Sequence, residues 1–153
     1  MIEGKEGKRG ERGLTGEPGL SALAQLPSGR TESGDFLLIA NAVAPGEKVE
    51  TLITFPVPLQ LPFTVEHIEF TKAKTPGKNC VGPGAKPKGF LCIYVSDESN
   101  VVQGEHEATK GTSTDPEIEP PVAGTGRFGA ILSWEAAAPG RVRVLGSWAI
   151  TEL

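Results

Sequence analysis

The chain has little of what metal sites, membrane spans and nucleic-acid interfaces are built from. Its 153 residues include only two cysteines and two histidines, which excludes a cysteine-rich structural zinc cluster. No apolar run reaches the roughly 18 to 20 residues that a membrane-spanning helix needs, so we expect no membrane insertion. The net charge of −4 does not suit the concentrated basic face of a nucleic-acid binder, so we expect no nucleic-acid partner.

Motifs for catalysis and for cofactors are missing as well. The sequence has no glycine-rich phosphate loop, no serine nucleophile elbow and no paired-histidine helix. The two histidines, His67 and His106, lack the partner spacing of a metal site. We therefore expect neither an enzyme nor a bound cofactor or metal. Calcium at the acidic stretch between Asp97 and Glu119 stays an open alternative, although that stretch has no EF-hand spacing.

What the sequence has instead is glycine in strict register near its start. Every third residue is glycine, at Gly4, Gly7, Gly10, Gly13, Gly16 and Gly19. This Gly-X-Y period is typical of a collagen triple helix, because only a hydrogen side chain fits at the crowded axis of three polyproline-like strands. A flexible linker would need glycine but not a period of three. We predict a collagen-like stalk at residues 1–21, with the six glycines at its axis.

This stalk is too short and too poor in proline to hold itself together. Only Pro18 pre-sets the polyproline conformation. Ordering each residue costs roughly 1–2 kcal/mol of backbone entropy, and exposed charge pairs such as Glu6 with Lys8 return only a few tenths of a kcal/mol. We therefore expect a downstream domain to clamp three chains.

The remainder of the chain has the pattern of a small β-domain. Residues 22–34 are expected to form a neck or linker, and residues 35–153 a C-terminal head. Short strand-like segments separated by turn residues recur along the head, at Phe36–Ala42, Val49–Phe55, Phe63–Thr71, Phe90–Val95, Asn100–Gln103, Arg127–Trp134 and Arg141–Thr151. No segment shows convincing helical periodicity with caps. We predict an all-β head, an antiparallel β-sandwich or jelly roll.

Cys80 and Cys92 enclose a loop rich in glycine and proline. Cross-linking such a poorly ordered loop would remove much of its unfolded-state freedom. Collagen-like stalks belong to oxidising, extracellular settings, where a cysteine pair of this kind normally closes. We predict a Cys80–Cys92 disulfide, with two buried free thiols as the alternative.

The charges of the head are polarised along the chain. Lysines cluster between Lys72 and Lys88, and acidic residues cluster between Asp97 and Glu119. Two solvated loops of opposite sign are the simpler interpretation. The alternative is that the basic loop of one subunit meets the acidic loop of its neighbour and fixes their register.

The chain resembles bacterial collagen-like surface proteins. The resemblance rests on the six triplets and on three segments of the head, Ile53–Leu59, Gly89–Val95 and Gly146–Thr151. It implies a homotrimer in which the terminal domain nucleates and registers the triple helix. It also implies an extracellular or cell-surface location, with any signal peptide lying outside this sequence.

Two functions are consistent with these features. The first is a structural, assembly-directing protein whose head trimerises and holds the stalk. Candidate interface residues are Leu20, Leu23, Leu26, Phe36, Phe128, Trp134 and Trp148. The alternative is a trivalent recognition tip, an adhesin or phage tail-fibre head, that binds an extracellular glycan or protein receptor through exposed residues around positions 100–125.

Overall fold

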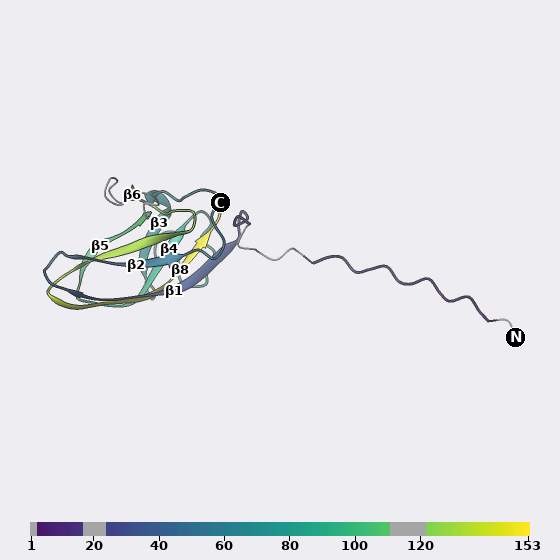
Figure 1. Ribbon diagram of the computed structural model, residues 1–153, viewed down its shortest axis with the longest axis horizontal. Coiled ribbons are helices and arrows are strands. Elements are labelled where there is room, and N and C mark those ends of the chain that lie inside the picture. Colours follow the sequence, from purple (N-terminus) through teal and green to yellow (C-terminus); the bar gives the residue numbers. More distant parts are fainter. Residues whose placement is uncertain (1–2, 17–23, 111–121) are drawn as a thin grey trace.

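The structure is a computed structural model that describes residues 3–16, 24–110 and 122–153. Residues 3–16 form an extended, exposed segment, and the chain from Thr31 onwards forms two packed β-sheets (Figure 1). In chain order the elements are β1 (Thr31–Ala42), β2 (Lys48–Thr54), the 3₁₀ turn η1 (Val65–His67), β3 (Ile68–Lys72), β4 (Leu91–Ser99), β5 (Val101–Lys110), β6 (Val122–Ala123), β7 (Gly129–Ala136) and β8 (Gly140–Thr151). Within the described ranges there is no α-helix, and accordingly no helix long and apolar enough to span a membrane.

The eight strands confirm the predicted all-β sandwich. One sheet has the order β1-β8-β4-β3, and the other has the order β2-β7-β5-β6. The chain crosses between the sheets after β1, after β2, after β4 and after β7, so that both sheets contain strands from both halves of the head. Neighbouring strands are antiparallel with one exception, because β3 and β4 run parallel. The prediction of an antiparallel sandwich is wrong at this pair, where a long connection returns the chain to the end of the sheet at which β3 began, so that β4 runs in the same direction.

Several strand boundaries differ from the sequence-based expectation. β1 begins at Thr31, inside the predicted neck, where the Thr31 hydroxyl lies 2.6 Å from that of Thr151 on β8. The segment predicted as a strand from Phe63 to Thr71 begins with η1, and only its second half pairs with β4. β5 continues to Lys110, well beyond the predicted end at Gln103, because β7 supplies pairing partners for its polar second half.

Two glycine–aromatic pairs determine how β1 packs beside β8. Gly34 is opposite Trp148, and Phe36 is opposite Gly146. A Cβ at Gly34 would lie 2.9 Å from Trp148 Nε1, and a Cβ at Gly146 would lie 2.8 Å from the Phe36 ring. Each aromatic ring therefore covers bare backbone on the opposite strand. This lets Phe36 reach across the sandwich and stack on Trp134 of the other sheet, with ring centroids 5.7 Å apart.

The long connection between β3 and β4 is fastened to the outside of its sheet. The predicted disulfide between Cys80 and Cys92 is present, with Cα atoms 5.5 Å apart. The Glu69 carboxylate on β3 accepts hydrogen bonds from the backbone N–H of Asn79, at 3.0 Å, and of Cys80, at 3.4 Å. Both cysteines are fully buried and pack with Tyr94 and Ala149 in a cluster separate from the main core.

Removing this disulfide should destabilise the head without changing its fold. We expect the double variant Cys80→Ala/Cys92→Ala to lose about 3 kcal/mol of unfolding free energy, because the cross-link no longer restricts the unfolded chain. Urea unfolding followed by circular dichroism measures this loss, and wild-type protein treated with reductant serves as the matched comparison. A loss below about 1 kcal/mol in both samples would contradict the expectation.

Candidate functional site

The predicted interface residues do not form one exposed surface. Leu26, Phe36, Trp134 and Trp148 are buried in the core of a single head, so they are not the exposed apolar face that the sequence suggested. Phe128 is the exception, since 64% of its surface is exposed. Leu20 and Leu23, like the axial glycine Gly19, lie outside the described residues.

The neck is fixed to one end of the sandwich. The Leu26 N–H donates to the Pro58 carbonyl at 2.8 Å, and the Leu26 carbonyl accepts from Gln60 Nε2 at 3.0 Å. The Gly29 N–H donates to the Glu152 carbonyl at 2.9 Å. The chain that arrives from the stalk is therefore bonded directly beside the C-terminus, at the same end of the head (Figure 1).

Four exposed apolar side chains lie on segments at the end of the head where the neck is bonded. We call them the apolar base, and they are Leu61 (74% exposed), Val65 (56%), Phe128 (64%) and Leu153 (61%). Their segments are joined by hydrogen bonds from the Leu59 N–H to the Arg127 carbonyl, at 2.8 Å, and from the Thr125 N–H to the Phe63 carbonyl, at 2.9 Å. Leu61 and Leu153 also line one surface hollow, and exposed apolar side chains at one end of a domain make that end a candidate for a surface that another molecule covers.

Five of the glycines predicted to be axial lie in the described segment and have no contact within the chain that would explain them. An added Cβ at Gly4, Gly7, Gly10, Gly13 or Gly16 would meet no atom within 4 Å. Every residue from 3 to 16 is exposed. The period of three is therefore not required by the packing of this segment in a single chain.

The basic and acidic stretches of the sequence meet within one head. Lys72 and Lys74 line the same surface hollow as Asp97 and Glu98. Asp97 also forms an ion pair with Arg143 of β8. Charge matching between subunits is thus not needed to bring these segments together. Asp115, Glu117 and Glu119 lie outside the described residues, and among the residues that are described no group of three or more His, Cys, Asp or Glu side chains could hold a metal.

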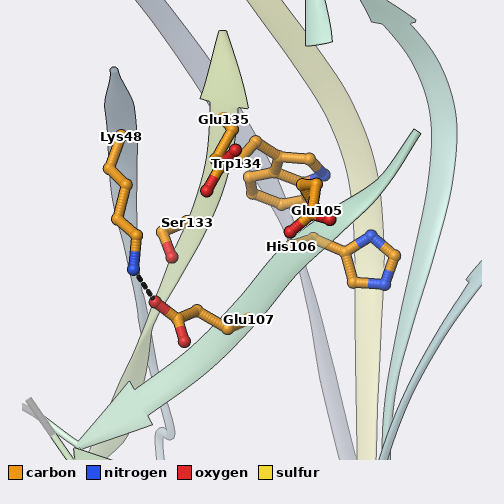
Figure 2. Close-up of a pocket in the computed structure, with 7 residues that line it drawn as sticks. All are labelled: Lys48, Glu105, His106, Glu107, Ser133, Trp134 and Glu135. Atoms are coloured by element: carbon orange, nitrogen blue, oxygen red, sulfur yellow. Dashed lines mark hydrogen bonds and ion pairs between the residues drawn. The ribbon is translucent and has the colours of Figure 1, made fainter. Parts of the chain in front are cut away.

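The outer face of the second sheet carries a cross-strand ion pair. Lys48 of β2 reaches Glu107 of β5 across Ser133 of β7 (Figure 2). Glu107 pairs with Ser133 in the sheet register, whereas His106 pairs with Trp134. Because neighbouring residues of a strand face opposite sides, His106 and Ser133 lie on opposite faces and do not form a base–nucleophile pair.

A cleft opens between β3, at the edge of the first sheet, and β5 of the second sheet. Phe70 of β3 stacks on His106 of β5, with ring centroids 4.2 Å apart, and meets Trp134 edge-on at 5.9 Å. Trp134 is 1% exposed, and its indole nitrogen has no hydrogen-bond partner. The cleft has a volume of about 270 Å³. Sequence reasoning placed His106 in an acidic loop and gave no sign of this stack, because its three rings come from three separate strands.

Comparison with protein-family models, curated proteins and solved structures gives no match.

The aromatic stack makes stability depend on pH through His106. Burial lowers the pKa of His106, and the Glu98 and Glu105 carboxylates oppose this effect more weakly. The unfolded chain therefore binds this proton more readily, so the folded state loses stability as the pH falls through about 6.5. We expect wild-type protein to lose more unfolding free energy between pH 7.5 and pH 5 than His106→Phe, which keeps a ring against Phe70.

Urea titrations of both proteins at the two pH values test this expectation. Burial raises the pKa of Glu32, which acts in the opposite direction. Glu32 is present in both proteins, so the difference between them isolates His106. Equal losses in the two proteins would show that His106 does not contribute.

Proposed function

We propose that this protein is a structural, assembly-directing protein whose head trimerises and holds three chains in register as a collagen-like triple helix. The observation that carries this proposal is the strict glycine period in a segment where one chain offers no contact to explain it. In a triple helix the same positions face two neighbouring strands, and a Cβ would not fit there.

The apolar base supports the proposal by its position. Three stalk strands must come together where they leave their heads, and the neck is bonded to the head beside Leu61 and Leu153. Covering exposed apolar side chains at this point stabilises the trimer by roughly 25 cal/mol per Å² of apolar surface removed from water. Once the heads associate, the strands are held at high effective concentration, which offsets part of the entropy of winding them.

The disulfide supports an extracellular or cell-surface location for this assembly. Such bonds persist in oxidising compartments and are rare where thiols are kept reduced. The two nested strand pairs, β1 with β8 and β2 with β7, suit a jelly-roll-like head of the kind expected from the resemblance to bacterial collagen-like surface proteins. The fibre would then be a homotrimeric stalk capped by three sandwiches.

A second candidate function is a trivalent recognition tip on the same stalk. The observation that favours it is the cleft lined by Phe70, His106 and Trp134, which the assembly role does not use. Three copies of such a cleft would bind a receptor with useful avidity even if each site were weak.

Charged residues at the apolar base should prevent trimerisation. We expect wild-type protein to have three times the 16.1 kDa chain mass in solution at micromolar concentration. Leu61→Glu/Leu153→Glu should reduce this to the mass of one chain, because uncompensated carboxylates would be buried near one another. Size-exclusion chromatography with light scattering measures the masses.

The matched control is Leu37→Glu/Leu52→Glu, which changes two exposed leucines on the outer faces of β1 and β2. This variant should remain trimeric. A monomeric wild-type protein would contradict the proposed function, and equal loss of the trimer in both variants would contradict the placement of the interface at the base.

A single axial substitution should unwind the stalk but leave the heads folded. We expect Gly10→Ala to lower the melting temperature of the triple helix by at least 10 °C, because a methyl group does not fit at the axis. Circular dichroism of the full chain in the collagen region measures this. Lys8→Ala, at a position facing outward in a triple helix, is the control and should melt within a few degrees of wild type. Equal melting temperatures for the Gly10→Ala and Lys8→Ala variants would argue against a triple helix.

A further inference from the structure

The cleft between β3 and β5 has an aromatic wall and a polar rim. The wall consists of the stacked rings of Phe70 and His106, with Trp134 behind them. The rim includes Lys72 at the end of β3, Glu98 at the end of β4 and Gln103 of β5. The volume of about 270 Å³ is close to the lower limit of small-molecule pockets, which begin at about 300 Å³. This volume restricts the cleft to a small ligand, no larger than about one ring.

Trp134 lines this cleft and has a buried hydrogen-bond donor without a partner in the described part of the chain. Its side chain is almost completely buried, and its Nε1–H has no partner among the described residues. The nitrogen lies on the side of the indole nearest His106 (Figure 2). A buried donor without an acceptor costs about 1–3 kcal/mol, so an acceptor brought by a ligand would recover part of that cost.

The charges at the rim disfavour charged ligands. Lys72 and Glu98 have opposite signs and line the same cleft, so their fields largely cancel within it. Glu98 also accepts a hydrogen bond from Gln103 Nε2 at 2.8 Å, which leaves the amide oxygen of Gln103 free to accept. A ligand with several hydroxyl groups would find both hydrogen-bond donors and hydrogen-bond acceptors at this rim.

We propose that this cleft binds a neutral sugar ring. One face of a pyranose presents C–H groups that pack against aromatic rings, and its hydroxyl groups can form hydrogen bonds with the polar rim. The inference goes beyond the assembly role and does not rest on it, because every residue of the cleft comes from a single chain. A monomeric head would bind the same sugar, with lower avidity.

Titration of the full chain with neutral sugars tests this proposal. The probes are methyl β-glucoside, methyl β-galactoside and N-acetylglucosamine. Binding of each probe is followed by ¹H–¹⁵N NMR. We expect at least one of them to shift the Trp134 indole N–H saturably, with a Kd on the order of 1 mM. His106→Ala and Gln103→Ala should each weaken this binding at least fivefold.

Lys48→Ala is the matched control, because Lys48 lies on the opposite face of the same sheet and should leave the affinity unchanged. The proposal is overturned if no neutral sugar shifts the indole N–H, or if binding survives in both His106→Ala and Gln103→Ala. Binding of glucuronate or glucosamine alone would also overturn it, because the site would then select charge. None of these results bears on the mass of the assembly, so this inference and the proposed function can fail separately.

Discussion

β1 and β8 pair along their whole lengths, from Thr31 opposite Thr151 to Ala42 opposite Gly140. This pairing places the first and last strands of the head side by side in one sheet. It therefore brings the neck and the C-terminus to one end of the sandwich, where the Gly29 N–H donates to the Glu152 carbonyl. The pairing depends on Gly34 and Gly146, because a side chain at either position would collide with the aromatic ring opposite. The location of the apolar base follows from this arrangement.

Much of the fold could be predicted from the sequence, because alternating apolar residues and turn residues are local signals. The disulfide was predictable for the same reason, since Cys80 and Cys92 bracket a loop with little order of its own. The parallel pairing of β3 with β4 could not be predicted, because it depends on where a long connection lays the chain. The length of β5 was underestimated, because the charged residues around His106 give no apolar alternation although their backbone pairs with β7.

The candidate interaction surfaces were harder to predict than the strands, because sequence patterns do not say which apolar residues are buried within a single folded head. Phe36, Trp134 and Trp148 were reasonable interface candidates, yet each fills space between or beside the strands of a single head. Leu61 and Leu153 could not be identified from the sequence, because isolated leucines near prolines or at a chain end belong to no periodic pattern. Only the packing shows that these two side chains remain exposed beside the neck.

The apolar base and the cleft lie at different distances from the neck along the strands of the sandwich. In the β4–β8 register, Leu91 is opposite Ile150 near the base, whereas Glu98 at the cleft is opposite Val144, further from the neck. Heads joined through the base would therefore leave the Glu98 end of β4 away from the point where the three necks converge. This separation would allow one small sandwich to hold three stalk strands in register at the end beside the neck. The polar, aromatic-lined cleft would then lie further from the neck. The two proposed roles would then place independent demands on the sequence, with apolar exposure at Leu61 and Leu153 for one and the stacked rings of Phe70 and His106 for the other.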